Sequence, residues 1–369
     1  MVVDVVLAIA GGVVVVLTVL SAIVTVVVPR GVPVRLTRTV FLFSRKLFEL
    51  RSGIFRHDYD KRDRAMALYA PVTLVALAFV WLVWVLLGFT AVFHAIADVS
   101  WAAAFEVSGS SLVTLGLVGV HGVGQYLASF TEAGLGLLLL ALLITYLPTM
   151  YAAFSRREAL VTRTSISAGT PPTAWALIER YQRIAGFDRL ESNFWVPWTA
   201  GFIDIEESHT SLGALALFRS PQPHRSWITA SGCVLDTAAL MQSSVAGYDS
   251  AAAQLTMRAG YLALRAIADY FGVPHDPEPA PDDPISISRA EWEEILDELA
   301  GAGVPIVDDR DRAWCDFAGW RVNYDAALLG LAGFTMAPYA PWSGDRSPVL
   351  TQARRGIRGR ARRGRSPDA

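Results

Sequence analysis

The sequence predicts an all-α membrane protein, in which transmembrane helices and a re-entrant loop precede a soluble α-helical cytosolic domain. Three observations support this class. Of the 369 residues, 53% are hydrophobic and only 18% are charged, whereas an ordinary soluble domain carries about 25% charged residues. Residues 65–155 contain no Lys or Arg. No alternating β pattern occurs in residues 156–345. This composition argues against a wholly soluble enzyme.

Three stretches without formal charge are long enough to cross a bilayer, whose core needs about 20 apolar helical residues. We predict transmembrane helices within residues 1–28, 65–97 and 133–155. The first stretch has no basic segment before it, and Pro29 and Arg30 follow it where a signal peptide would have small residues. We therefore expect this helix to be retained in the mature protein.

The distribution of basic residues predicts the orientation. Residues 29–64 contain ten Lys or Arg, and Arg156 and Arg157 follow the third predicted span. Because basic loops remain in the cytoplasm, we expect the N-terminus outside and the domain of residues 156–345 in the cytoplasm. The strong preference for Arg over Lys is typical of high-GC bacteria, which makes the bacterial plasma (inner) membrane the expected location.

Two basic segments are expected at the cytoplasmic surface of the membrane. Residues 34–55 mix aromatic and aliphatic residues with Arg and Lys. This pattern is typical of an amphipathic helix at the inner surface, although a solvated loop is the alternative. Residues 346–369 are rich in Arg and Gly and are predicted to be disordered, with anionic lipid as the favoured partner.

Residues 98–132 carry the strongest functional signal, because they are too apolar for an exposed loop and too interrupted by Gly for a crossing. Trp101–Leu112 predicts a helix of roughly 18 Å, which is too short to span a bilayer. Four glycines follow it: Gly116, Gly119, Gly122 and Gly124. Irregular backbone at membrane depth is tolerated only where protein or a water-filled cavity satisfies its polar groups. We predict a re-entrant loop; the alternative is a hairpin that only packs against the spans.

The segment that follows this short helix resembles the selectivity filter of the potassium channel family, whose usual pattern is Thr-Val/Leu-Gly-Tyr/Phe-Gly-Asp. The corresponding residues of this chain are Thr114, Leu115, Gly116, Leu117, Val118 and Gly119. The first three match the pattern, but Leu117 replaces the aromatic residue and Val118 replaces the second glycine. A β-branched residue tolerates a positive φ poorly. The filter is therefore either rebuilt around Gly119 or coordinates potassium differently.

The resemblance implies a span–pore loop–span unit that assembles as a homotetramer in the lipid bilayer. Backbone carbonyls of four filter strands would replace the hydration shell of a monovalent cation, with potassium as the expected ion. We predict no enzymatic activity, catalytic residue, metal site, cofactor or nucleic-acid partner, because nucleotide-binding, hydrolase and metal-ligand motifs are missing from the sequence. The alternative function is a non-conducting, membrane-anchored helical sensor or scaffold.

Several further residues are candidates for roles in a pore. The predicted pore helix and outer mouth contribute Glu106, Ser110, Ser111 and His121. The acids Asp98, Glu106 and Glu132, without an opposing cation, would give the outer mouth a negative field that concentrates cations; exported loops, however, avoid Lys and Arg in any case. Pro148 interrupts the third predicted span and is a candidate gate hinge.

The cytosolic part predicts a helical bundle. Residues 276–284 read as a linker of Pro and acidic residues that ends regular structure. Ser288 and Glu291 have the spacing of a capping box at the start of the following helix. We expect this domain to assemble or gate the pore, and the sequence alone does not identify a ligand for it.

Overall fold

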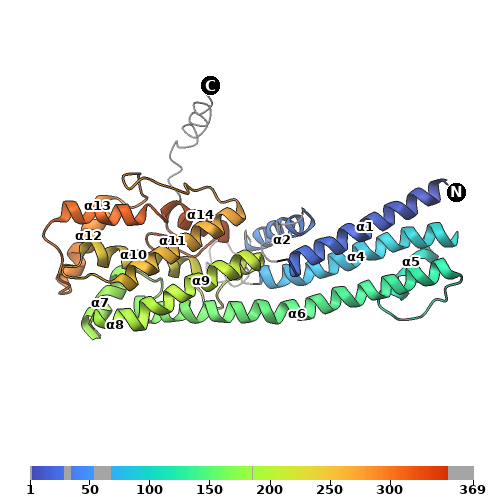
Figure 1. Cartoon of the computed structure of the whole chain (residues 1–369), viewed down its shortest axis with the longest axis horizontal. Helices are drawn as coiled ribbons and strands as arrows, with labels where there is room; N and C mark the ends of the chain where they lie inside the picture. Colours follow the sequence, from blue (N-terminus) through green and yellow to red (C-terminus); the bar gives the residue numbers. More distant parts are fainter. Residues whose placement is uncertain (1, 29–34, 54–67, 185, 348–369) are drawn as a thin grey trace, which may run out of the picture. The chain divides into compact units, whose positions relative to one another are not determined.

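The computed structural model describes residues 2–28, 35–53, 68–184 and 186–347, and these residues form helices and connecting segments without a β-strand (Figure 1). The expected all-α class is confirmed. The chain divides into two compact units, Met1–Phe154 with Ser211–Phe218, and Ser155–Thr210 with Arg219–Ala369. Most of the predicted basic loop outside its amphipathic helix, and residues 348–369 of the predicted tail, lie outside the described residues.

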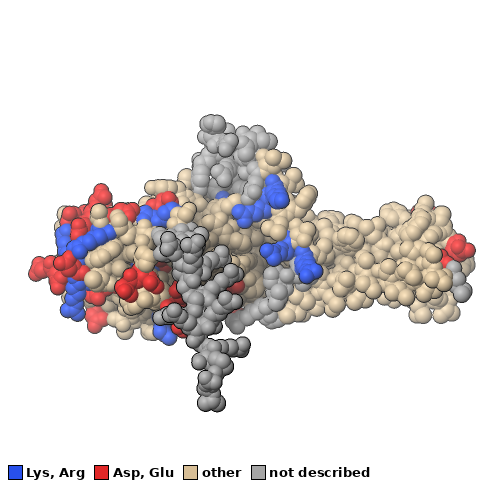
Figure 2. All heavy atoms as spheres, turned by 90° about the horizontal axis from the view of Figure 1, so that it is seen from above, with Lys and Arg blue, Asp and Glu red and all other residues tan. Residues whose placement is uncertain are grey.

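The first unit contains the three long apolar helices. Its elements are α1 (Val2–Val26), α2 (Arg35–Gly53), α4 (Tyr69–Ala97), α5 (Trp101–Leu112), the first part of α6 (Val123–Ala168) and the 3-10 helix η2 (Gly213–Leu217). By length and composition α1, α4 and α6 are able to cross a membrane. Figure 2 shows a long uncharged stretch on the face of this unit that it displays. These features fit a membrane-embedded protein.

Helix α6 differs from the sequence-based expectation at its start. It begins at Val123, not at residue 133, and continues to Ala168 without a break. The prediction ended the uncharged run at Glu132, but that side chain is buried within the chain, so its charge does not mark the end of the helix. Gly122, with a φ of 87°, precedes the first turn and allows the backbone to enter the helix from an irregular segment.

Helices α1 and α4 approach each other closely at two glycines. A Cβ on Gly11 would lie 2.4 Å from the carbonyl oxygen of Gly88, and a Cβ on Gly88 would lie 2.9 Å from that of Gly11. The indole N–H of Trp81 donates to the Ser21 hydroxyl at 3.3 Å elsewhere along the same contact. Small residues and interhelical hydrogen bonds are the usual means by which helices associate in lipid.

Helix α2 is docked against α4 and against the end of α1. The Tyr69 hydroxyl donates to the carbonyl oxygen of Phe41 at 2.9 Å, and the hydroxyls of Thr25 and Thr37 lie 2.8 Å apart. Its other sides carry exposed apolar residues, Leu42, Phe43, Leu47 and Leu50, and basic residues, Arg35, Arg38, Arg45 and Lys46. The predicted amphipathic helix is thus present, and its position at the membrane surface remains a prediction.

The second unit is a helical bundle built around one buried helix. Besides the end of α6 it contains α7 (Ala174–Ile184), α8 (Asp188–Leu190), the π-helical turn η1 (Glu191–Trp195), α9 (Val196–Ser211), α10 (Trp227–Ser244), α11 (Ala251–Phe271), α12 (Arg289–Gly301), α13 (Arg310–Arg321) and α14 (Asp325–Thr335). All of α10 except Gln242 is buried, because α7, α11, α13 and α14 pack around it. The predicted capping box is confirmed, since Ser288 and Glu291 bond reciprocally at the start of α12.

The end of α6 and helix α9 are joined by a buried cation. Arg157 contacts the Glu158 carboxylate at 3.0 Å and the Nε2 atom of His209 at 3.2 Å. Burial, and then the charge of Arg157, lower the pKa of His209 well below its ordinary value. The imidazole is therefore neutral, with Nδ1 donating to the carbonyl oxygen of Ile205 at 2.8 Å and Nε2 accepting from Arg157.

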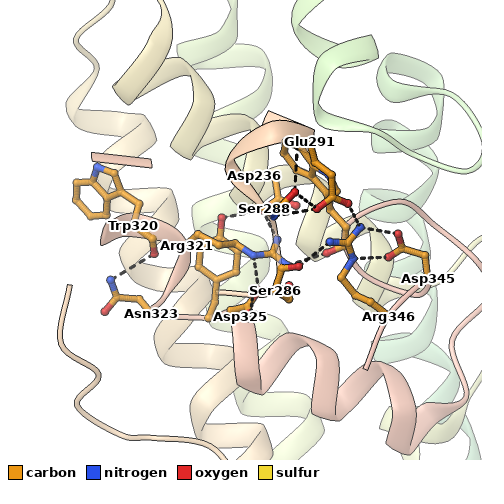
Figure 3. A network of polar contacts seen from close by, with 12 residues as sticks. Asp236, Ser286, Ser288, Glu291, Trp320, Arg321, Asn323, Asp325, Asp345 and Arg346 are labelled. Carbon is orange, nitrogen blue, oxygen red and sulfur yellow. Dashed lines mark hydrogen bonds and ion pairs between the residues drawn. The ribbon is translucent and has the colours of Figure 1, made fainter. Parts of the chain in front are cut away.

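A buried ionic network holds the bundle together (Figure 3). The guanidinium of Arg321 on α13 donates to Asp236 on α10, to Asp325 on α14 at 2.7 Å and to the carbonyl oxygen of Trp342 at 2.7 Å. The Tyr324 hydroxyl donates to Asp236 at 2.8 Å. Although burial lowers the pKa of Arg321, the two carboxylates raise it above its ordinary value, so the cation stays charged.

Replacing Asp236 with Ala should destabilise the second unit severely, by about 3–5 kcal/mol, because Arg321 would keep a buried charge with one carboxylate fewer. The measurement is the thermal unfolding of the full-length protein, followed by tryptophan fluorescence. Asp316→Asn is the matched control, since Asp316 belongs to an exposed pair with Arg312 at 3.8 Å and exposed pairs contribute about 0–1 kcal/mol. Equal shifts for the two variants would contradict the assignment.

Candidate functional site

Helix α5 runs back along α4. Near its start the Trp101 ring stacks on His94, with ring centroids 4.2 Å apart. Later in α5 the hydroxyl oxygen of Ser108 lies 3.0 Å from the carbonyl oxygen of Leu86, which comes earlier in α4. The two helices are therefore antiparallel. Leu86 lies roughly 16 Å from the end of α4 by the rise per residue, so α5 reaches well into the length of that apolar helix.

Helix α5 runs in the same direction as α6. Ser108 bonds to Glu132 at 2.6 Å, and the carbonyl oxygen of Leu112 would lie 2.2 Å from a Cβ on Gly136. From the first contact to the second, the residue number rises by four on α5, from Ser108 to Leu112, and also by four on α6, from Glu132 to Gly136. Residue numbers rise together in this way when two helices are parallel. Residues 113–122 must therefore return the chain to the level at which α5 began, before α6 starts at Val123.

The backbone of this returning segment is left-handed at two positions. Thr114 has a φ of 55° and Gly116 a φ of 67°. The sequence comparison instead placed the conformational difficulty at Val118, where the family pattern has a glycine. Neither Val118 nor Gly119 has a positive φ in this structure, so the backbone is not rebuilt around a left-handed Gly119. The unusual conformation falls on the positions that match the pattern.

Ser110 anchors the returning segment to the last turn of α5. Its hydroxyl accepts the backbone N–H of Leu117 at 2.8 Å and, at 3.4 Å, that of Val118. Its carbonyl oxygen accepts the N–H of Leu115 at 2.9 Å. One serine thus satisfies backbone donors that no regular element pairs, which explains how an irregular segment keeps a defined shape.

The apolar side chains of the segment are uncovered within a single chain. Leu115 is 61% exposed and Leu117 is 77% exposed. Large apolar patches on a surface mark contact with a membrane or with another protein. Contact with lipid or with further copies of the chain is therefore the expectation for this loop.

The other predicted site residues lie in different surroundings. The Ser111 and Ser129 hydroxyls are 2.8 Å apart, so Ser111 ties α5 to α6. Glu106 and His121 are exposed. Pro148 lies inside the continuous helix α6 and is exposed, so its role as a hinge remains a prediction.

Glu132 does not lie where the sequence analysis placed it. We expected it to contribute, with Asp98 and Glu106, to a negative field at an outer mouth. Its side chain instead has no exposed surface within the chain, and its Oε1 atom lies 2.6 Å from the Ser108 hydroxyl oxygen. The early start of α6 places Glu132 on the helix face that packs against α5, which removes it from any aqueous mouth.

Helix α6 has two exposed faces of different chemistry within residues 130–152. One face carries bulky residues: Phe130, Leu137, Leu140, Ile144 and Tyr151. Together with Leu138, which is 40% exposed, the neighbouring face carries mostly small or hydroxyl-bearing residues: Gly134, Ala141, Thr145, Thr149 and Ala152. A helix surrounded only by lipid needs no such division, because every outward face then meets hydrocarbon.

No protein-family model matches the chain, and no curated protein and no solved structure matches it significantly. The likeness to potassium channels therefore rests on the filter-like residues and on their setting between apolar helices.

Replacing Ser110 with Ala should loosen residues 113–122, because two backbone N–H groups lose their acceptor at a cost of about 1–3 kcal/mol. Hydrogen-exchange mass spectrometry of the full-length protein in nanodiscs should show faster exchange in peptides that cover this segment. Ser111→Ala is the control, because its hydroxyl bonds to Ser129 and not to the segment. Equal exchange in the two variants would argue against the anchor.

Proposed function

We propose that several copies of this chain, most simply four, form a cation-conducting pore in the bacterial plasma membrane. Residues 114–119 of each copy line its narrowest part. The observation that carries this proposal is the path of the chain, which turns back beside α4 at Leu112 and returns as irregular backbone held by Ser110. Such backbone is stable at membrane depth only where protein or water satisfies it, and a pore supplies the water.

The charge of this region favours cations. Residues 65–155 contain no Lys or Arg, so no fixed positive charge of these residues opposes a cation. Glu106 on α5 is exposed, and in the proposed pore its charge attracts cations. We expect the ion to be potassium because Thr114, Leu115 and Gly116 resemble the filter of the potassium channel family. Backbone carbonyls would be the coordinating groups.

The two faces of α6 fit this arrangement. The face with Thr145 and Thr149 suits contact with water, because each hydroxyl donates to a carbonyl of its own helix, at 3.0 Å to Ala141 and 3.0 Å to Thr145, and keeps an acceptor for water. The bulky face suits lipid. In the proposed pore the small face lines the water-filled path below the loop.

Gly116→Val should abolish ion flux while the protein still inserts into membranes. A left-handed conformation costs a residue with a Cβ about 1–2 kcal/mol, which is enough to displace the loop in most subunits. The assay is flux from liposomes that contain the purified full-length protein, with potassium and sodium gradients compared. Gly124→Val is the matched control, because Gly124 is helical and has nothing within 4 Å of an added Cβ.

Unchanged flux in Gly116→Val would refute the role of the loop. A protein that is monomeric in nanodiscs and gives no flux in either gradient would overturn the pore as a whole, since one loop per chain requires several copies. The non-conducting sensor or scaffold would then be the better account.

Cysteines on the two faces of α6 should differ in reactivity. In a Cys315→Ser background, which removes the exposed native thiol, Thr145→Cys should react with a membrane-impermeant thiol reagent and lose at least about tenfold in flux. Ile144→Cys, one residue earlier and on the bulky face, should remain unmodified. The measurement is mass spectrometry of the labelled protein in liposomes together with flux. Reaction at Ile144→Cys but not at Thr145→Cys would reverse the proposed orientation of α6.

A further inference from the structure

A buried acid lies between three helices of the first unit. Glu132 on α6 has no exposed surface within the chain. Its Oε1 atom is 2.6 Å from the Ser108 hydroxyl oxygen on α5, and that oxygen is 3.0 Å from the carbonyl oxygen of Leu86 on α4. The Oε2 atom has no hydrogen-bond partner among the described residues.

The Ser108 hydroxyl has one hydrogen but faces two oxygens. A carbonyl oxygen only accepts, and an ionised carboxylate also only accepts. With Glu132 ionised, the single hydrogen of Ser108 serves only one of the two short contacts, and the Leu86 carbonyl keeps the Thr90 hydroxyl as its other donor at 2.7 Å. With a proton on Glu132, the carboxylic acid donates to Ser108, the Ser108 hydroxyl donates to Leu86, and both short contacts become hydrogen bonds.

No neighbouring charge offers another solution. Residues 65–155 contain no cationic side chain of Lys or Arg. On α4, His94 lies roughly 12 Å along the helix from Leu86 and is bound to the carbonyl oxygen of Val99 at 2.6 Å. On α5, Glu106 is exposed and carries the same charge as an ionised Glu132. A buried carboxylate without a counter-ion costs several kcal/mol, and a proton removes that cost.

We propose that Glu132 holds a proton in the structure described and that Glu132, Ser108 and Leu86 form a hydroxyl relay that fixes α5 between α6 and α4. Ser108 lies two residues before Ser110, which anchors residues 114–119. Glu132 is therefore a positioning residue for the loop. Loss of the proton leaves one of the two contacts of Ser108 without a hydrogen and places a buried charge beside no counter-ion, which weakens the hold on α5. Only the consequence for conduction rests on the proposed function.

Infrared difference spectra of the full-length protein in nanodiscs at neutral pH test the proton directly. We expect a carbonyl band of a protonated carboxylic acid in the native protein, and we expect Glu132→Gln to lack it. Glu106→Gln is the matched control, because it removes an exposed acid of the neighbouring helix and should leave the band in place. Absence of the band from the native protein, or its persistence in Glu132→Gln, would overturn the proposal.

Thermal unfolding tests the relay. Glu132→Gln keeps a donor for Ser108 and should retain the native Tm, whereas Glu132→Ala and Ser108→Ala should each lower it. The double variant should lose less than the sum of the two shifts, because both remove the same relay. Additive shifts would refute the coupling.

A flux assay distinguishes the failure of the relay from the failure of the pore. Native flux should fall as the pH is raised, and Glu132→Gln should lose that dependence. If the infrared band and the coupling of the double variant are both observed but the protein gives no flux, the relay stands and the pore is refuted. Flux with the same pH profile in both proteins would refute the relay and leave the pore intact.

Discussion

The first unit depends on one constraint, which is that every backbone N–H and C=O group at membrane depth needs a partner. Helices α1, α4 and α6 meet it internally. Helix α5 is too short to span, so the chain after Leu112 must find partners outside a regular helix. Ser110 supplies them from its hydroxyl and its carbonyl oxygen. The filter-like segment therefore has a defined backbone because the last turn of the helix before it contains Ser110.

The two units solve the burial of a carboxyl group in different ways. In the second unit Asp236 and Asp325 meet the guanidinium of Arg321, a cation that remains charged when buried. The first unit has no Lys or Arg within residues 65–155, so Glu132 meets only a serine hydroxyl. A proton on the carboxyl group and a hydrogen bond with the Ser108 hydroxyl are then what allows Glu132 to be buried. The absence of Lys and Arg allows this segment to enter the bilayer. For the same reason Glu132, its single buried acid, has no cation to pair with, so its stability depends on whether it is protonated.

Much of the fold is predictable from the sequence, because apolar length, the amphipathic pattern of α2 and the capping pair of Ser288 and Glu291 are local signals. The start of α6 is not predictable in this way. Glu132 ended an uncharged run, and only its contact with Ser108, 24 residues earlier, shows that it belongs inside the helix. The left-handed conformation of Thr114 also escapes a comparison of residue types, since it depends on how Ser110 holds the turn.

Helix α6 is held by polar contacts both before and after Pro148. Before it, Ser129 and Glu132 bond to α5. After it, Arg157 contacts His209 on α9. A proline removes the N–H that would pair with the carbonyl four residues earlier, so α6 lacks one backbone hydrogen bond here, although Tyr146 and Met150 close to Pro148 are buried within the chain. A bend at Pro148 would have to move these buried side chains as well, and the role of Pro148 as a gate hinge stays a prediction.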